Sequence, residues 1–281
     1  MNDKLFLGLQ HLLPQHALTS LVYSLTRNRT PFIKNALISA FVRHFKPDMR
    51  EAVEPNALAY ASFNEFFTRP LRPDARPIET DASTLVSPVD GTISQIGALL
   101  DSSLLQAKGI YYSLDALLDG RQEYAALFAN GLFATLYLAP FNYHRIHMPL
   151  TGRLRASWYV PGDLFSVNAT TAASVAGLFA RNERVVCIFE NGPLTFGLIL
   201  VGALFVGSME TVWHGQITPR RPRTACDLAP QPAPLQRGLE MGRFNMGSTV
   251  ILILPPGAAG WLPAFTAGST IRVGQALARL T

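Results

Sequence analysis

The sequence is poor in charged residues and cysteine, and it has no apolar run long enough to cross a membrane. Only 15% of its 281 residues are charged, whereas 48% are hydrophobic, which is enough for a sizeable buried core. The longest apolar stretch, residues 194–209, is broken by three glycines and a serine. It is shorter than the roughly 20 residues that a membrane-spanning helix requires. Two strands of a core explain this stretch better.

Only two cysteines are present, Cys187 and Cys226, which is too few for a disulfide framework, so we expect a reducing compartment. Cys187 lies in the apolar run 185–189 and is predicted to be a small core residue. No small-residue cleavage site follows the first apolar run, so no signal peptide is predicted. The sequence also lacks a P-loop, a dinucleotide-binding glycine motif, a His-Glu-x-x-His motif and internal repeats.

The positive charge is concentrated in residues 1–50, where seven basic residues face two acidic ones and account for the whole net charge of +5. Helices are predicted at 3–13, 15–26 and 31–46, separated by Pro14 and Pro31. Apolar side chains of the third helix recur at helical spacing: Phe32, Ala36, Leu37, Ala40, Phe41 and Phe45. This face fits either a cap packed on the core or a helix in the membrane interface. The basic residues are few and accompany a broad apolar face, so we do not expect nucleic acid as a partner.

From about residue 84 the pattern changes to strands, with runs at 85–93, 132–138, 151–160, 185–190, 194–207, 249–254 and 270–277. A short helix is expected at the start of 57–78 and another near 169–180, and residues 214–236 are expected to form an exposed loop. The predicted fold class is α+β: a mainly β core of antiparallel or mixed sheets, with amphipathic helices at the N-terminal end. The predicted organisation is a helical, membrane-associating segment at 1–56 and a β-rich catalytic domain at 57–281.

Two histidines, His144 and His147, lie in the stretch Tyr-His-Arg-Ile-His-Met-Pro. Residues three apart cannot share one face of a regular strand. The flanking prolines, Pro140 and Pro149, therefore predict a loop in which both imidazoles reach one site. Such a pair suits either acid–base chemistry or zinc binding.

A small turn, Met-Gly-Ser-Thr, precedes the apolar run 250–254. It places the hydroxyl of Ser248 beside the carbonyl of Gly247, which has no side chain to block an attack. Asp90 lies in a second tight turn, Asp-Gly, for which a purely structural role is the alternative. Aspartate, histidine and serine are the components of an activated nucleophile, although their order along the chain does not define a triad.

Taken together, these motifs resemble bacterial phosphatidylserine decarboxylase, of the proenzyme type that makes its own pyruvoyl group. The resemblance covers nearly the whole chain, and its serine motif has Met246 where the family usually has Leu or Val. The stretches that carry it are 63–72, 87–93, 143–149, 179–185, 201–213 and 238–250.

The resemblance implies that Asp90 orients His147, and that His147 takes the proton of Ser248 as this serine attacks Gly247. Cleavage of the Gly247–Ser248 bond would give a β chain, 1–247, and an α chain, 248–281, which form a heterodimer. Ser248 would become the pyruvoyl cofactor, which forms a Schiff base with the substrate amine. No metal is expected, and His144 is the candidate proton donor after decarboxylation.

The implied partners are the substrate phosphatidylserine and an anionic membrane surface, at the cytoplasmic side of the cell membrane as a peripheral protein. The sequence also admits a higher oligomer. Two other classes stay open at this point. One is a zinc-dependent hydrolase with His144, His147 and Asp90 as ligands. The other is a non-catalytic β module that rests on membranes.

Overall fold

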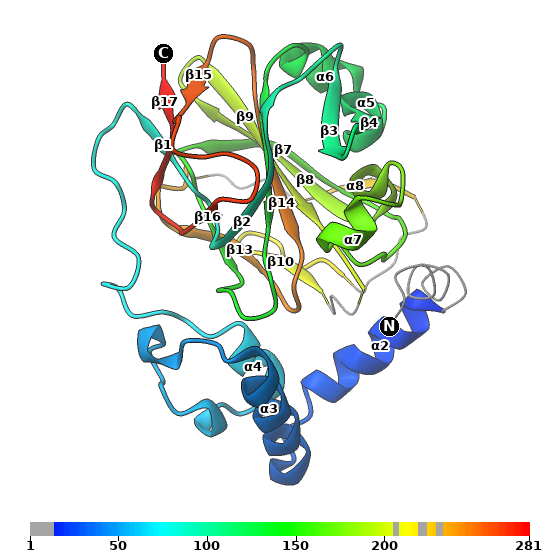
Figure 1. Ribbon diagram of the computed structural model, residues 1–281, viewed down its shortest axis with the longest axis vertical. Coiled ribbons are helices and arrows are strands. Elements are labelled where there is room, and N and C mark those ends of the chain that lie inside the picture. The colour runs from blue at the N-terminus through cyan, green and yellow to red at the C-terminus, as the bar shows by residue number, and fades with distance from the viewer. Residues whose placement is uncertain (1–13, 205–207, 219–223, 229–232) are drawn as a thin grey trace.

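The computed structural model describes residues 14–204, 208–218, 224–228 and 233–281. The helix predicted at 3–13 lies outside these ranges. The N-terminal helices α2, α3 and α4 lie below a β-rich body, and the chain enters that body after α4 (Figure 1). The observed fold is α+β with a β-rich core, which confirms the predicted class. Among the described residues no helix has the length and apolar character needed to cross a membrane.

Two helices follow the predicted pattern closely: α2 spans Gln15–Thr26 and α3 spans Pro31–Phe45. Pro31 takes the first turn of α3, where its missing N–H costs no hydrogen bond. Lys46 ends the helix in a left-handed conformation with φ of 49°. The shorter helices are η1 Met49–Glu51, η2 Ala57–Ala59, α4 Phe63–Phe67, α5 Leu114–Leu117, α6 Gln122–Phe128, α7 Ala169–Ala172 and α8 Leu178–Arg181.

The apolar face of α3 is divided between packing and exposure. Phe41 is buried and packs edge-on against Phe63, Phe66 and Phe67, with ring centroids 5.3–5.8 Å apart. Phe32, at the other end of the helix, is 84% exposed. Both alternatives for this face therefore stay open: its C-terminal half packs against α4, and Phe32 at its N-terminal end is free to meet another surface.

The main element is an antiparallel sheet of eight strands in the order β12-β7-β8-β9-β14-β5-β2-β16. Strand β14 lies between β9 and β5, and all six of its residues are buried. Such full burial explains its continuous apolar sequence. The strands are β12 Cys226–Asp227, β7 Arg153–Val160, β8 Arg184–Asn191, β9 Leu194–Val201, β14 Thr249–Leu254, β5 Leu132–Tyr137, β2 Gly91–Ala98 and β16 Thr270–Ile271.

Three smaller sheets surround this one. A four-stranded sheet has the order β11-β10-β13-β6, a three-stranded sheet the order β1-β17-β15, and β3 pairs with β4. Their strands are β11 Gly215–Gln216, β10 Met209–Thr211, β13 Glu240–Phe244, β6 Arg145–His147, β1 Thr84–Val86, β17 Ala276–Leu280, β15 Ala259–Trp261, β3 Ser103–Ala107 and β4 Ile110–Ser113.

Several local expectations need correction. The stretch around the two histidines is not entirely a loop, because residues 145–147 form β6 and pair with β13. The helix expected near 169–180 is two short helices, α7 and α8, separated by a turn that ends at Gly177 with φ of 67°. The strand expected at 194–207 ends at Val201. Cys187 is buried as predicted, and both cysteines are free.

Candidate active site

Ser248 immediately precedes β14, at the end of the turn that leads from β13 into the centre of the large sheet. Its side chain is fully buried, and its Oγ has no hydrogen-bond partner among the described residues. The Ser248 carbonyl accepts a hydrogen bond of 2.9 Å from the amide of Leu138, so the backbone is fixed on the side of β5. A buried hydroxyl without a partner is costly, and such a group often has a chemical role.

The turn itself is held by Asn245. Its amide donates to Glu210 at 3.0 Å and to the hydroxyl of Ser208, and its side-chain oxygen accepts from Asn64 at 3.0 Å. These contacts join the turn to β10 and α4. The position of the Gly247–Ser248 bond is thus set by three separate segments of the chain.

His144 faces this turn. Its Nδ1 lies 2.8 Å from the carbonyl of Asn142, so Nδ1 carries the proton and Nε2 presents a lone pair. Nε2 has no hydrogen-bond partner in the part of the chain that the structure describes, and it lies 3.3 Å from the position that a Cβ on Gly247 would occupy. Burial lowers the pKa of His144 to about 3, so the imidazole is neutral at physiological pH. Its ring packs on Phe67 with centroids 4.1 Å apart.

His147 lies on β6 and is held at both ring nitrogens. Nδ1 donates to the carbonyl of Gly238 at 2.7 Å, which leaves Nε2 to accept from the hydroxyl of Tyr143 at 3.0 Å. Burial lowers its pKa, while the neighbouring carboxylates of Glu240 and Asp90 favour the protonated form. No hydrogen bond joins His147 to Ser248.

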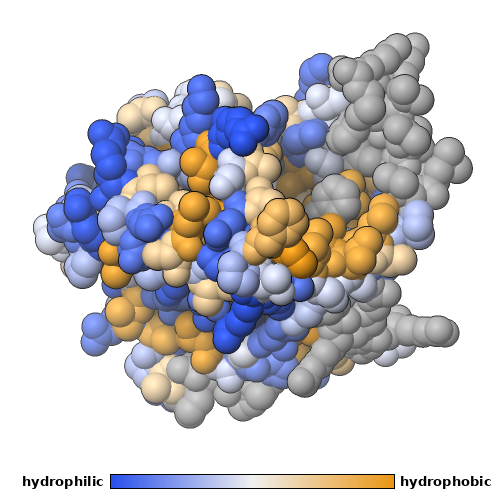
Figure 2. All heavy atoms as spheres, turned by 90° about the horizontal axis from the view of Figure 1, so that it is seen from below, coloured by the Kyte–Doolittle hydropathy of each residue, from blue (hydrophilic) through white to orange (hydrophobic). Residues whose placement is uncertain are grey.

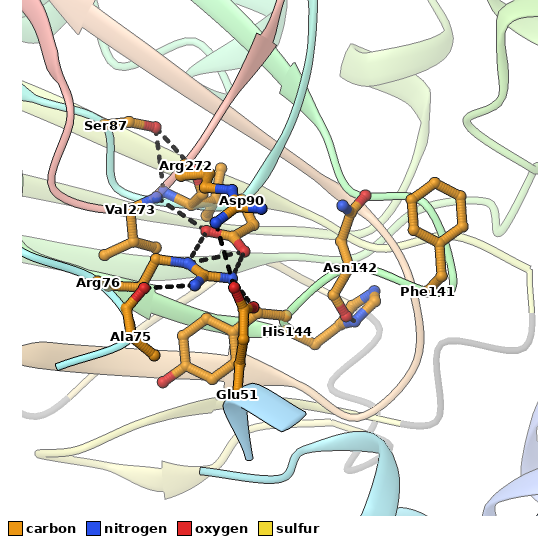
Figure 3. Close-up of polar contacts among 12 residues, drawn as sticks. Glu51, Ala75, Arg76, Ser87, Asp90, Phe141, Asn142, His144, Arg272 and Val273 are labelled. Atoms are coloured by element: carbon orange, nitrogen blue, oxygen red, sulfur yellow. Dashed lines mark hydrogen bonds and ion pairs between the residues drawn. The ribbon is translucent and has the colours of Figure 1, made fainter. Parts of the chain in front are cut away.

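Asp90 is buried in the turn between β1 and β2 and is bound mainly by an arginine. Arg76 donates to both carboxylate oxygens at 2.5–3.0 Å, and the amide of Val273 donates to Oδ1 at 2.9 Å (Figure 3). Arg76 also bonds Glu51 at 2.8 Å, and this bond lowers the pKa of Glu51. Asp90 makes no hydrogen bond with His147, so it acts on that residue only through its charge.

The four predicted side chains therefore lie in two groups: Ser248 with His144, and His147 with Asp90 behind it. A cavity of about 320 Å³ opens onto Gly247 and is lined largely by apolar side chains. Its polar lining comes from Tyr137, Ser166 and Asn168, which sequence reasoning did not assign to the site. The only available signal was the placement of Ser166 and Asn168 in an otherwise apolar run. The mouth includes Phe41 and Phe45 of α3.

The zinc alternative receives no support from the geometry. Within the described ranges, no group of three or more His, Cys, Asp and Glu side chains is placed to hold a metal ion. His144 and His147 each have Nδ1 directed to a backbone carbonyl. Asp90 is already bound by Arg76.

Comparison with known proteins gives one consistent family. A family model described as phosphatidylserine decarboxylase matches residues 63–279, and one described as PSD matches residues 5–46. Three relatives are phosphatidylserine decarboxylase proenzymes. That of Bordetella avium is 49% identical and covers 99% of this chain and 95% of its own length. That of Methylibium petroleiphilum is 51% identical and covers 99% of this chain and 98% of its own length. That of Alcanivorax borkumensis is 49% identical and covers 100% of this chain and 98% of its own length.

Proposed function

This chain belongs to the phosphatidylserine decarboxylase family, and from that premise we propose that it is made as a precursor that cuts itself between Gly247 and Ser248. It is a carboxy-lyase that converts phosphatidylserine to phosphatidylethanolamine and CO2. The observation that carries the self-cleavage proposal is the buried Oγ of Ser248. Ser248 follows Gly247, which offers no steric barrier to the attack, and Nε2 of the neutral His144 faces that glycine.

The proposed cut proceeds by an N-to-O acyl shift, an elimination and a hydrolysis. The Ser248 Oγ attacks the Gly247 carbonyl carbon, the C–N bond breaks, and the proton of Oγ passes through a histidine to the nitrogen of Ser248. Loss of the Ser248 Cα proton then expels Gly247 as a carboxylate and leaves a dehydroalanine. One water hydrolyses its imine tautomer to a pyruvoyl group and ammonia. The products are a β chain, 1–247, and an α chain, 248–281.

We assign the proton transfer from Ser248 to His147, with Asp90 as its supporting charge. The base must become an imidazolium, and the carboxylates of Glu240 and Asp90 favour that form at His147. At His144 the imidazolium form is opposed by burial and, to a lesser extent, by the positive charge of Arg69. For this transfer the hydroxyl of Tyr143 has to give up its hydrogen bond to Nε2 of His147. Such a change is ordinary, because catalytic hydrogen bonds often form only when the reacting groups come together.

His144 is assigned to the later step, protonation of the carbanion that decarboxylation leaves. The pyruvoyl carbonyl supplies the electron sink for that step. The position of His144 fits this role, because its Nε2 faces Gly247, the residue next to Ser248. The cut also creates a carboxylate at Gly247, and a negative charge beside an imidazole favours the protonated form. Self-cleavage thus turns His144 from a poor base into an available acid.

The two chains are proposed to stay together as a heterodimer, because β14 of the α chain is hydrogen-bonded between β9 and β5 of the β chain. The lipid substrate is proposed to enter the cavity at Gly247 past Phe41 and Phe45. We place the protein on an anionic membrane, at the cytoplasmic side. Hydrophobic side chains gather on the underside of the molecule (Figure 2), and residues 1–50 carry its excess positive charge.

Intact-mass measurement of the purified, denatured protein tests the proposal. We expect two chains with masses that correspond to 1–247 and 248–281, the smaller one carrying a reactive ketone in place of its N-terminal amine. Ser248→Ala should give one uncut chain without decarboxylase activity, because no oxygen remains to attack. A wild-type protein that stays whole after long incubation yet decarboxylates phosphatidylserine would overturn the self-cleavage proposal and leave the activity standing.

A further inference from the structure

Arg69, which follows α4, is a buried cation that makes no ion pair with any residue that the structure describes. Its side chain is 3% exposed, and two of its three guanidinium nitrogens, Nε and Nη1, have no hydrogen-bond partner among the described residues. The third, Nη2, makes one long bond of 3.3 Å to the carbonyl of Phe141. The guanidinium also lies 5.8 Å from the ring of Phe66. Burial lowers its pKa, which shows how poorly the site solvates the charge.

Another buried arginine of this protein, Arg184, has hydrogen-bond partners for all three of its guanidinium nitrogens. Arg184 is 2% exposed, and its three nitrogens donate to backbone carbonyls at 2.6–3.1 Å. Taking a charge out of water without such partners costs several kcal/mol. The unpaired state of Arg69 is therefore specific to its site, and it is the state expected of a residue whose partner is a ligand.

Arg69 lines a cavity of about 460 Å³ between the 139–143 segment and the start of β2. The carboxylates of this cavity are already neutralised. Asp90 and Glu51 are bound by Arg76, and Arg272 adds a second contact to Glu51 at 3.1 Å.

The cations of the cavity exceed its unpaired carboxylates. Its remaining acid, Asp48, pairs with Arg50 at 2.8 Å. Among the described residues, Arg69 and Lys46 line the cavity and make no ion pair. Other potential donors on its wall are the hydroxyls of Thr92 and Thr270 and the amide of Asn142.

We propose that this cavity binds a phosphate group, with Arg69 as its principal ligand and Lys46 at its rim. Nε and Nη1 of the guanidinium have no partner among the described residues, and both are covered in this structure, so Arg69 must turn toward the cavity to present its planar fork to a tetrahedral oxyanion. The group is either the headgroup of an anionic phospholipid or a free phosphate. The site is distinct from the Ser248 cavity, because Pro140 lines that cavity whereas Phe141, Asn142 and Tyr143 line this one. The two cavities are lined by different residues, but Asp90, the proposed supporting charge of His147, lines this one.

The site is coupled to the reaction centre. The positive charge of Arg69 opposes protonation of His144, after the larger effect of burial. A phosphate on Arg69 would cancel that charge and make His144 easier to protonate. An anion bound here therefore favours the form of His144 that donates a proton.

Thermal unfolding of the Ser248→Ala protein, which stays in one chemical state, tests the site with inorganic phosphate as the probe. Sodium phosphate is compared with sodium chloride at equal ionic strength. At a tenfold excess of phosphate over its dissociation constant, the midpoint should rise by about 3 °C. Adding Arg69→Met should abolish the rise, and Arg69→Lys should weaken it because the fork is lost. Arg155→Met is the matched control, since Arg155 lies on the surface, pairs with Glu190, and neither residue lines the cavity.

A second arm identifies the source of the phosphate group. Micelles of phosphatidylcholine with and without phosphatidylglycerol replace inorganic phosphate, and neither lipid is the substrate. A rise that needs phosphatidylglycerol and Arg69 assigns the site to a lipid headgroup, whereas a rise only with inorganic phosphate assigns it to the free anion. The proposal is overturned if neither probe shifts the midpoint, or if Arg69→Met shifts as the parent does. Whether the wild-type chain is cut is read separately by mass.

Discussion

At the scale of single residues, the two histidines of one short segment have different surroundings, and substitution should separate their roles. His147 has carboxylates nearby, whereas His144 faces Gly247, packs on Phe67 and lies near the positive charge of Arg69. We expect His147→Ala to block self-cleavage, because Ser248 loses its base. His144→Ala should still be cut, at least in part, and should lose decarboxylation by roughly 10²-fold or more, the usual contribution of a proton-transfer group.

Cleavage is read from denaturing gels over time, and decarboxylation from CO2 release per cut chain. Tyr143→Phe is the control for His147, because it frees Nε2 without removing the imidazole. This variant should be cut at least as fast as the wild type. If His144→Ala blocks the cut while His147→Ala does not, the roles are reversed.

His144 also makes the stability of the precursor depend on pH. Its pKa is about 3 when folded and about 6.5 when unfolded, so the unfolded chain binds more protons between these values. The stabilisation is complete above pH 6.5 and is lost as pH falls toward 3. At pH 5 this group should lower the free energy of unfolding by about 2 kcal/mol relative to its value at neutral pH.

Urea titrations at pH 5 and 7.5 check this in the Ser248→Ala background. His144→Gln should reduce the difference between the two pH values by about that amount, because glutamine does not titrate. An unchanged difference in His144→Gln would contradict the assigned pKa.

At the scale of elements, β14 is the strand that we expect to hold the two proposed chains together. It is buried along its whole length between β9 and β5. Leu252→Ala removes a fully buried side chain from its centre and should cost about 2–5 kcal/mol. The urea concentration at which the two chains separate on a sizing column should fall accordingly. Leu239→Ala, at a half-exposed position, should change it little. Separation at the same concentration in both variants would show that β14 does not hold the chains.

The same element shows what sequence could and could not predict. The strand at 249–254 was predicted with its observed bounds, because full burial leaves a continuous apolar run in the local sequence. The strand at His147 was missed, because its pairing partner β13 lies about 90 residues later and leaves no local pattern. No prediction covered the β3–β4 hairpin or helices α5 and α6.

The residues of the candidate site stay a prediction from motifs, whereas their pairing could be seen only in the structure. Ser248, His144, His147 and Asp90 came from motifs. The partner of Asp90 is Arg76, on a proline-rich segment 14 residues earlier, and nothing in the local sequence indicates that ion pair. The unpaired state of Arg69 was equally invisible, because it depends on which acids the fold leaves near it.

At the scale of the whole molecule, the exposed apolar residues of the N-terminal helices define the surface that we expect to meet the membrane. Leu21 and Leu25 of α2 and Phe32 of α3 are exposed, whereas Phe41 is packed inside. Replacing the three exposed residues by Ser should weaken binding to anionic vesicles at every salt concentration, because it removes apolar surface worth about 25 cal/mol per Å².

Replacing Lys34 and Arg43 by Glu should weaken the same binding mainly at low salt, by about 1 kcal/mol for each base removed and more for the reversed charge. Vesicle flotation at two salt concentrations distinguishes the two effects. Leu100→Ser, at an exposed apolar position between β2 and β3, serves as the control. If the apolar variant floats like the parent, these helices are only a cap on the core.

The proposed cut lies in the turn that leads into the large sheet, and it would make maturation irreversible with respect to folding. The precursor brings β14 between β9 and β5 as part of one continuous chain, in a concentration-independent process. After the cut, the same strand belongs to a separate short peptide, residues 248–281, and its return to the centre of the sheet becomes a bimolecular encounter. In the uncut chain the insertion of β14 is thus an intramolecular step. Denatured mature enzyme should recover with a rate that depends on protein concentration, whereas the Ser248→Ala precursor should not.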